Sequence, residues 1–205
     1  RDPDLKTVLS PIHDWFKRQG WSPLPFQQRT WEAYLDGRSG LIQVPTGSGK
    51  TFAAVMGPIA RMLEDSEDRQ GIRLLYITPL RALTRDLALA VQEPIDAMNW
   101  PLRVGIRNGD TSTSERSRQV RTPPDILITT PESLCVLLAG RHCERLFRNL
   151  DTVILDEWHE LIGSKRGIQA ELALSWLRQQ RPQLQTWAIS ATIGNLEESA
   201  RHALG

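Results

Sequence analysis

The chain has 205 residues, 40% hydrophobic and 24% charged, which fits one globular domain with a full core and argues against disorder as its dominant state. Lysine and arginine number 25 against 24 aspartate and glutamate, so a nucleic-acid partner would need a local basic surface rather than a cationic chain. No apolar run approaches the roughly 18 residues that span a bilayer, so we expect no membrane partner. Cys135 and Cys143 match no CxxC metal or redox spacing, which favours a reduced, cytoplasmic protein.

Two helical patterns open the chain. Ser10 and Pro11 are typical of a cap and first residue, which predicts a short helix that ends at Gly20. A second helix is predicted over residues 25–36, ended by Gly37.

Six apolar segments follow, separated by amphipathic ones. They are rich in Ile, Val and Leu without polar alternation, as parallel strands covered on both faces are. The predicted strands are residues 40–44, 73–78, 102–107, 125–129, 152–156 and 186–190. Helical spacing relates Phe52, Val55, Met56, Ile59 and Leu63, and again Leu172, Ala173, Trp176 and Leu177. The sequence therefore predicts an α/β fold, an open and mostly parallel sheet with helices on both faces, whose ligands bind where strands end in loops.

The loop after the first predicted strand has the composition of a phosphate cradle. Gly47 and Gly49 allow the backbone to curl, Lys50 can reach β- and γ-phosphate oxygens, and the Thr51 hydroxyl can coordinate Mg²⁺. Val44 occupies the place of the first glycine of the strict pattern. The alternative is a glycine-rich turn with a solvated lysine, and the flanking strand and helix argue against it.

Two adjacent carboxylates end the fifth predicted strand. Asp156 can hold Mg²⁺, and Glu157 can orient and deprotonate an attacking water. Alone, the pair would be better explained as an acidic turn after a core strand, and Lys50 elsewhere in the chain favours the catalytic interpretation.

These motifs, in this order, resemble the superfamily 2 helicases over nearly the whole chain. The motif string comprises FQQ at 26–28, PTGSGKT at 45–51, TPLRAL at 78–83, TPESL at 130–134, DEWH at 156–159 and SAT at 190–192. DEWH, RNGDT at 107–111, GSKRG at 163–167 and SATIGNLEE at 190–198 are most similar to bacterial Lhr-like, ligase-associated DEXH helicases. The resemblance implies a RecA-like P-loop NTPase domain that uses ATP and Mg²⁺.

The resemblance also implies residue roles. The catalytic residues would be Lys50, Asp156 and Glu157, and the Mg²⁺ ligands Thr51 and Asp156. Nucleotide contacts would come from Gln27, Pro45, Thr46, Gly47, Ser48, Gly49, Lys50, Thr51, Asp156, Glu157 and His159. Gln27 would read adenine beside the Gly20 and Trp21 segment, while Ser190, Ala191 and Thr192 would couple the sites. Taken alone, Gln27 would more often be solvated and His159 structural.

The expected nucleic-acid surface lies on loops at the ends of strands. It comprises Arg81, residues 108–111 with Gly109, Asp110 and Thr111, then Thr130, and further Lys165 and Arg166. Such groups contact phosphates without reading bases. SERSRQVR at 114–121 is interpreted instead as a solvated helix face, and Trp15, Trp31, Trp176 and Trp187 as core.

We expect residues 1–38 to form N-terminal helices with the glutamine motif and residues 39–205 to form a first RecA-like domain. The resemblance implies a second RecA-like domain of the same full-length chain, which supplies arginine fingers. It further implies a 3′-to-5′ DNA helicase acting on single-stranded or tailed duplex DNA or an RNA:DNA hybrid. Partners would include a repair ligase and nuclease, at the nucleoid of a bacterial cytoplasm.

Two alternatives stay open at this stage. An RNA helicase or RNP remodeler shares the same motifs, and RNA-only stimulation would identify it. A nucleotide-gated binding module that never hydrolyses ATP belongs to another class, and the presence of Glu157 argues against it because such a switch needs no water-orienting carboxylate.

Overall fold

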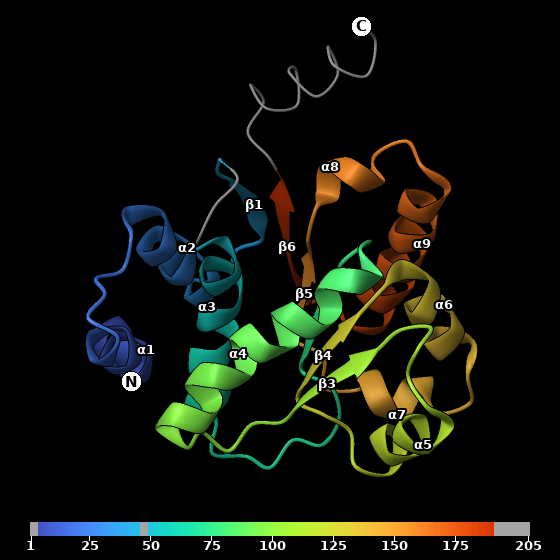
Figure 1. Ribbon diagram of the computed structural model, residues 1–205, viewed down its shortest axis with the longest axis horizontal. Helices are drawn as coiled ribbons and strands as arrows, with labels where there is room; N and C mark the ends of the chain where they lie inside the picture. The colour runs from blue at the N-terminus through green and yellow to red at the C-terminus, as the bar shows by residue number, and fades with distance from the viewer. Residues whose placement is uncertain (1–3, 46–48, 191–205) are drawn as a thin grey trace, which may run out of the picture.

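A computed structural model describes residues 4–45 and 49–190 of the chain. Its core is one sheet of six parallel strands in the order β1-β6-β5-β2-β4-β3. Figure 1 shows this sheet between its flanking helices. The strands are β1 (Gly40–Gln43), β2 (Leu74–Ile77), β3 (Val104–Arg107), β4 (Ile126–Thr129), β5 (Thr152–Leu155) and β6 (Gln185–Ser190). All six predicted strands are confirmed, each within two residues of its expected start.

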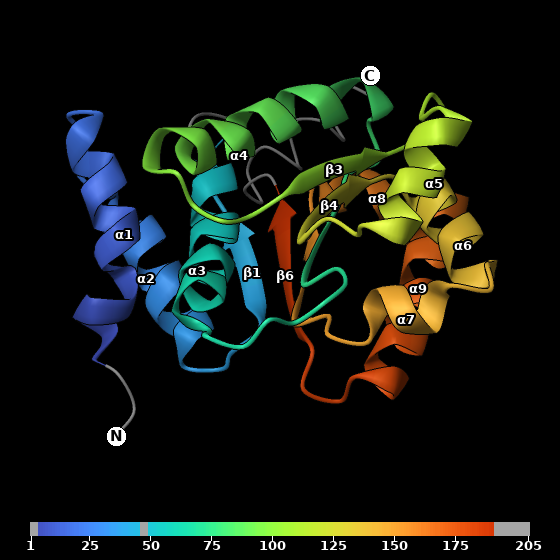
Figure 2. The same ribbon diagram turned by 90° about the horizontal axis from the view of Figure 1, so that it is seen from below.

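Helices cover both faces of this sheet. They are α1 (Leu5–Arg18), α2 (Pro25–Leu35), α3 (Lys50–Glu64), α4 (Thr84–Met98), α5 (Thr113–Arg121), α6 (Pro131–Ala139), α7 (Cys143–Phe147), α8 (Trp158–Leu161) and α9 (Lys165–Gln180), with a 3₁₀ turn at Arg81–Leu83. Figure 2 shows α1, α2 and α3 on one side of the sheet and α6, α7 and α9 on the other. The predicted fold class is confirmed.

Alternate strand residues explain why the apolar runs lack polar alternation. In β5, Ile154 packs into a cluster with α1, α3 and α4, while Val153 and Leu155 pack into a second cluster with α6, α7 and α9. Both sides of the strand are therefore buried, as parallel sheets require.

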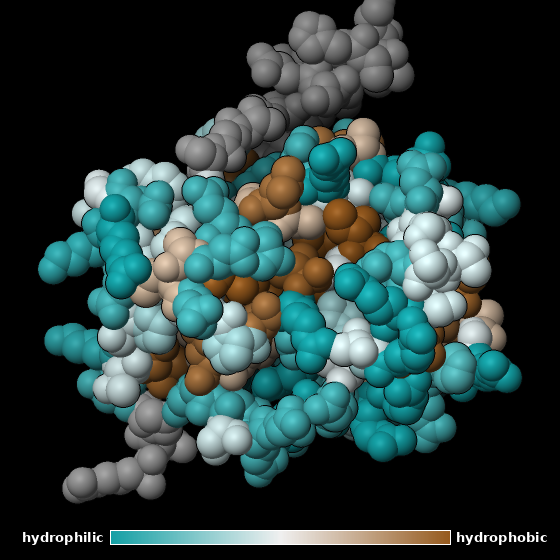
Figure 3. All heavy atoms as spheres, turned by 60° about the horizontal axis from the view of Figure 1, so that its bottom comes forward, coloured by the Kyte–Doolittle hydropathy of each residue, from teal (hydrophilic) through white to brown (hydrophobic). Residues whose placement is uncertain are grey.

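On the outer surface in Figure 3, hydrophobic side chains gather near the middle of one face and hydrophilic ones surround them.

The first helix begins earlier than its sequence signal. It starts at Leu5 after the N-cap Asp4, and Pro11 lies inside it rather than at its first position. Val8 and Leu9 belong to the same buried face as the later Trp15. Burial of this upstream turn offsets the missing donor and steric clash of an internal proline, which cost about 3 kcal/mol. The prediction of Ser10 as the cap is therefore wrong.

The predicted apolar face of the last helix is also partly wrong. Leu172 of α9 is 67% exposed, and Ala170, Ala173, Leu174 and Leu177 form the buried face instead. Trp176 is partly buried at the edge of the second cluster. The predicted core tryptophans Trp15, Trp31 and Trp187 are buried.

Parallel register brings the carboxyl ends of the strands to a common edge. Leu155 is level with Ile77 of β2, and Ile77 is level with Thr129 of β4. The residues that follow these strands therefore lie along one edge, the place where open α/β sheets bind ligands. Within residues 4–45 and 49–190, no helix combines the length and hydropathy needed to cross a membrane.

Candidate functional site

Lys50 and Glu157 meet at this edge, although 107 positions separate them in sequence. The Lys50 Nζ donates to the Glu157 Oε1 at 3.0 Å. Lys50 is the first residue of α3, where unpaired N–H groups and the helix dipole favour an anion. The side chains are 25% and 19% exposed, so the pair lies near the surface and stays within reach of a ligand.

Gly49 shapes the turn before Lys50. Its φ of +101° is a conformation that L side chains rarely adopt, and a Cβ there would lie 2.8 Å from the Gln27 Nε2. The positive φ therefore favours glycine at this position, and a larger residue would also displace the Gln27 amide. Thr46, Gly47 and Ser48, three of the predicted phosphate-loop residues, lie outside the described residues, and Pro45 is exposed just before them.

Asp156 follows β5 and is only 3% exposed. Its Oδ2 accepts a hydrogen bond from the Tyr76 hydroxyl at 2.6 Å, and its Oδ1 accepts from the Glu157 backbone N–H at 2.8 Å. Burial raises the pKa of the Asp156 carboxyl, although the Tyr76 hydrogen bond and the Lys50 charge oppose the rise. A nearby cation would stabilise the ionised form of a carboxylate buried in this way.

Tyr76 is a site residue that sequence reasoning missed. It lies within the apolar run of β2, is fully buried, and donates a hydrogen bond to Asp156, with the Thr51 side chain near its hydroxyl. Burial, and next the Asp156 charge, raise the pKa of its hydroxyl well above the ordinary value, so it stays protonated and donates. Tyr76 thus orients Asp156, one of the two residues predicted to hold Mg²⁺. A tyrosine amid aliphatic residues at the end of a predicted strand was the available signal.

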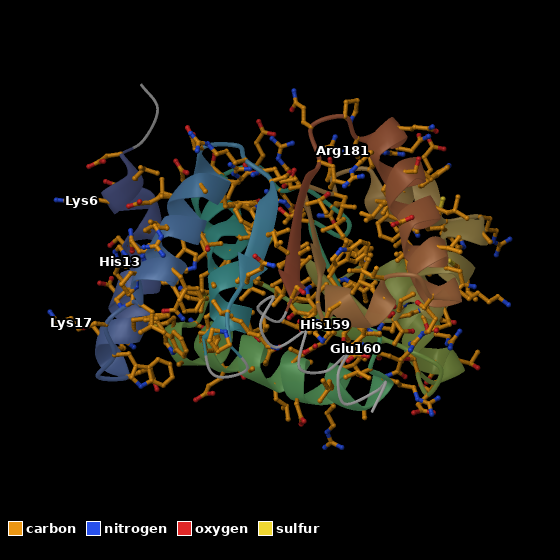
Figure 4. The ribbon with its side chains drawn as sticks, turned by 90° about the horizontal axis from the view of Figure 1, so that it is seen from above. Lys6, His13, Lys17, His159, Glu160 and Arg181 are labelled. Atoms are coloured by element: carbon orange, nitrogen blue, oxygen red, sulfur yellow. The ribbon has the colours of Figure 1, made fainter. Side chains whose placement is uncertain are left out.

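Glu157 adopts a left-handed backbone, with a φ of +51°, at the start of α8. This unusual conformation for a glutamate turns the chain sharply after β5 and supports a functional constraint. The His159 Nε2 lies 3.3 Å from the Glu157 Oε2 and 3.4 Å from the Glu160 Oε1. His159 and Glu160 are labelled in Figure 4, at the end of the sheet opposite Arg181.

A pocket of about 360 Å³ opens beside the Lys50 turn, between α1, α2 and α3. It is lined by Phe16, Trp21, Ser22, Leu24, Gln27, Gly49 and Phe52. The Gln27 amide accepts from the Leu24 N–H at 2.9 Å and donates to the Gly49 carbonyl at 3.0 Å. Trp21 is 49% exposed and packs edge-on against Trp15. Flat apolar walls with one amide fit a planar heterocycle such as adenine.

The predicted nucleic-acid residues divide into exposed and buried ones. Arg81 begins the 3₁₀ turn after β2, with its side chain 60% exposed and its Nε 3.5 Å from the Asp110 Oδ2. Gly109 is exposed as well, and Thr111 is half-buried. Thr130 is 3% exposed, and its hydroxyl caps α6 by accepting from the Ser133 N–H. Of the predicted coupling residues, Ser190 ends β6 and is buried, while Ala191 and Thr192 lie outside the described residues.

Part of the predicted solvated helix face points inward instead. The Arg116 guanidinium of α5 donates to the Asn108 and Thr111 carbonyls, both at 3.0 Å. Gln119 is 5% exposed and donates to the Ile106 carbonyl at 2.8 Å. Arg116 therefore holds the loop after β3 in shape. The prediction that the whole segment is a solvated helix face is therefore wrong. The partners of Arg116 are backbone carbonyls, and every residue type carries a carbonyl, so the sequence could not reveal them.

The donor set fits Mg-ATP. A lysine at a helix N-terminus suits phosphate, a buried carboxylate beside a threonine hydroxyl suits Mg²⁺, and an amide at an apolar pocket suits adenine. Lys50 bonds Glu157, which directly follows Asp156, while Gln27 bonds the Gly49 carbonyl of the turn that precedes Lys50. The predicted phosphate and metal residues are thus adjacent to the predicted adenine pocket.

Comparisons with known proteins agree with this geometry. A family model described as DEAD/DEAH box helicase matches residues 24–199. The Lhr helicase/uracil glycosylase of Escherichia coli strain K12 is 41% identical over 96% of this chain. The ATP-dependent helicase Lhr-Core of Methanothermobacter thermautotrophicus is 34% identical over 98% of it. A structure of Mycobacterium smegmatis helicase Lhr bound to ssDNA and AMP-PNP covers 91% of the chain, with a TM-score of 0.82 and 34% identity.

The matched relatives are much longer than this sequence. The chain covers 14% of the E. coli protein, 25% of the archaeal one and 25% of the M. smegmatis chain. The chain therefore spans only a quarter or less of each of these relatives. The chain belongs to the DEAD/DEAH box helicase family, as a helicase motor domain of the Lhr-like type.

Proposed function

We propose that this chain is the ATP-binding motor domain of a DNA helicase, in which Mg-ATP hydrolysis drives movement on single-stranded DNA. One observation carries the proposal. Lys50 and Glu157 form an ion pair next to the buried Asp156, at the edge of the sheet where ligands of such folds bind. Residues from two distant motifs would then supply a phosphate binder, a metal ligand and a base together.

Each residue has a task in this proposal. Bound Mg-ATP would supply the phosphoanhydride bond to be cleaved, and its Mg²⁺ would offset the negative charge of the phosphate oxygens. Lys50 would hold phosphate oxygens, and Thr51 and Asp156 would hold Mg²⁺. Glu157, released from Lys50, would accept the proton of the attacking water through a carboxylate that His159 helps to orient. Gln27 would recognise the adenine edge from the adjacent pocket.

The Glu157 placement also favours an enzyme over a nucleotide-gated binding module. Its carboxylate is 19% exposed and pairs with Lys50, and its backbone N–H bonds Asp156, the proposed metal ligand, so it lies where a water-activating base is needed. A switch that never hydrolyses nucleotide has no use for a carboxylate held in a left-handed backbone at that place.

The nucleic-acid track of this proposal is the row of loops after β2, β3 and β4. Arg81 offers an exposed guanidinium, and the loop held by Arg116 presents Gly109 and Thr111 beside it. Contacts of this type bind phosphates regardless of sequence. DNA as the substrate is supported by the single-stranded DNA in the M. smegmatis Lhr structure.

The finer parts of the proposal rest on family resemblance. They are 3′-to-5′ movement, action on tailed duplex DNA or an RNA:DNA hybrid, a role in repair with a ligase and nuclease, and work at the nucleoid in the cytoplasm. A second RecA-like domain in the same full-length chain would close the nucleotide site and the track, with residues 39–205 as the first such domain and residues 1–38 as its adenine-reading extension.

The test is steady-state phosphate release by the full-length protein with Mg-ATP, alone and with single-stranded DNA or single-stranded RNA of matched length. We expect DNA to stimulate turnover and RNA to stimulate it less. Stimulation by RNA alone would assign the domain to an RNA helicase or RNP remodeler. Tight Mg-ATP binding with no turnover under any condition would assign it to the nucleotide-gated module.

A further inference from the structure

Arg166 lies outside the loops of the track but hydrogen-bonds to residues beside two of them. It lies in the first turn of α9, and its Nε and Nη2 both donate to the Glu132 carboxylate, the Nη2 to Oε2 at 3.3 Å. The same Nη2 donates to the Pro79 carbonyl. Glu132 and Pro79 are 34 and 87 positions away in sequence. One guanidinium therefore connects three segments, namely the first turn of α9, the loop after β2 and the first turn of α6.

Two of these segments lie next to residues of the proposed track. Pro79 lies two positions before Arg81, after β2. Glu132 lies two positions after Thr130, in the first turn of α6 after β4. Because β2 and β4 are neighbours in the sheet, Arg166 spans the two loops where a nucleic-acid backbone would pass from one to the other.

The position of Arg166 is itself fixed by its neighbours. Ser164 caps α9 by accepting from the Gly167 N–H at 3.0 Å and donates to the Leu161 carbonyl at 2.8 Å. A Cβ on Gly167 would lie 1.9 Å from that same carbonyl oxygen, so only glycine allows this approach. Leu161 ends α8, which begins directly after Glu157. The position of Arg166 is thus linked through α8 to Asp156 and Glu157, the proposed catalytic carboxylates.

We propose that Arg166 is a positioning residue, which clamps the loops after β2 and β4 through Pro79 and Glu132 so that Arg81 and the α6 N-terminus face the nucleic-acid backbone together. The proposal rests on the proposed function, since it assigns Arg166 a place beside that track. It replaces the sequence-based expectation that Arg166 itself contacts phosphate.

Chemistry supports the clamp. The planar guanidinium can bond two carboxylate oxygens and a carbonyl at once, which a lysine ammonium on a flexible stem cannot do with the same geometry. Burial by itself raises the pKa of the Glu132 carboxyl, but the Arg166 hydrogen bond and charge outweigh it, so the pKa lies below its ordinary value and Glu132 stays ionised at neutral pH. A phosphate near Arg166 would have to compete with this carboxylate.

The two roles predict opposite effects of one substitution. If Arg166 bound phosphate directly, Glu132→Gln would remove a competing negative charge and tighten DNA binding. If Arg166 clamps the loops, Glu132→Gln weakens the clamp and DNA binding falls. Arg166→Lys also distinguishes the two roles. Lysine keeps the positive charge that would bind phosphate, but it cannot span Glu132 and Pro79, so only the clamp predicts weaker DNA binding.

The experiment measures the affinity of the full-length protein for a fluorescent oligo-dT by anisotropy, at one fixed salt concentration. We expect Arg166→Lys and Glu132→Gln each to weaken binding about fivefold, and the double variant to be no weaker than either single one. The matched control is the exposed Arg118 and Glu115 pair of α5, whose Nε and Oε2 are 3.1 Å apart. Arg118→Lys and Glu115→Gln should leave the affinity unchanged.

Two further measurements on the same samples keep the outcomes distinct. Mg-nucleotide affinity and the thermal unfolding midpoint should stay at wild-type values, and a parallel loss of either would assign Arg166 a general structural role and overturn the clamp. Tighter DNA binding by Glu132→Gln, or wild-type binding by Arg166→Lys, would also overturn it. A wild-type protein that binds no single-stranded DNA would instead refute the proposed function itself.

Discussion

Ion pairs lie at both ends of the central sheet, and they differ in how completely their charges are engaged. At the carboxyl end, the Lys50 Nζ has one described carboxylate partner, Glu157, and both side chains are partly exposed. At the amino end, the Arg73 side chain is 7% exposed and bonds Asp65 and Asp151 together. Arg181 adds a second cation to Asp151, and Figure 4 shows Arg181 far from His159 of the carboxyl end.

This difference teaches how a fold separates binding charges from structural ones. Arg73 is buried with its donors directed at two carboxylates, so no ligand can replace them without uncovering buried charge. Lys50 stands at a helix start with donors to spare, so a phosphate can replace Glu157 at little cost in stability. Removing a charge should therefore impair function at one end and folding at the other.

The largest effect is expected from Glu157→Gln. This change keeps shape and hydrogen bonding but removes the base, so DNA-stimulated turnover should fall about 100- to 10,000-fold while Mg-nucleotide affinity stays within a few-fold of wild type. Phosphate release and nucleotide titration measure the two quantities. Glu160→Gln, at the neighbouring carboxylate beside His159, is the matched control and should keep its turnover. Wild-type turnover in Glu157→Gln would place the base elsewhere.

Lys50→Ala should have the next largest effect. Loss of the phosphate-binding charge should lower turnover about 100- to 1,000-fold and weaken nucleotide binding. The free energy of unfolding should change by no more than about 1 kcal/mol, because the pair is partly exposed. Lys17→Ala on the exposed part of α1 is the control. A folded Lys50→Ala protein with normal turnover would contradict the assignment of Lys50 to phosphate.

Arg73→Ala tests the opposite end of the sheet. It leaves Asp65 and Asp151 without their shared buried cation, so unfolding should become easier by about 2 to 3 kcal/mol. Turnover per folded molecule should remain close to wild type. Arg38→Ala, which breaks the exposed pair with Asp36, should leave stability unchanged in the same urea titration. Equal stability losses in the two variants would remove the distinction between the sheet ends.

Tyr76→Phe should produce the smallest effect. The ring keeps its packing, but Asp156 loses the hydroxyl that orients it, so affinity for Mg-nucleotide should fall about tenfold. Affinity for nucleotide in the presence of EDTA should not change. Tyr34→Phe, which removes the other buried tyrosine hydroxyl from its 2.5 Å contact with Thr152, is the control. An equal loss with and without Mg²⁺ would contradict a role for the Tyr76 hydroxyl in metal binding.

The sequence predicted features that depend on local pattern. All six strands followed from apolar runs, because residues such as Val153 and Ile154 are buried on opposite faces. The meeting of Lys50 with Glu157 followed from parallel strands, whose ends share an edge.

Other features depend on partners that only the folded chain defines. Arg116 and Arg166 both bind backbone carbonyls, which every residue type has. The sequence instead predicts a solvated helix face for Arg116 and a phosphate contact for Arg166. Leu172 fits a helical apolar spacing, yet α9 turns its Ala173 side toward the sheet. Periodicity defines a face of a helix, and the packing of neighbouring elements decides which face is buried.

The central claim is that the Lys50 and Glu157 pair opens to receive Mg-ATP. The most direct measurement is a crystal structure of the protein with Mg²⁺ and a non-hydrolysable ATP analogue. We predict that the Lys50 Nζ leaves the Glu157 Oε1, now 3.0 Å away, for phosphate oxygens, that Asp156 faces the metal, and that adenine occupies the pocket beside Gln27 and Trp21. A nucleotide bound elsewhere, with the Lys50 and Glu157 pair intact, would contradict the account.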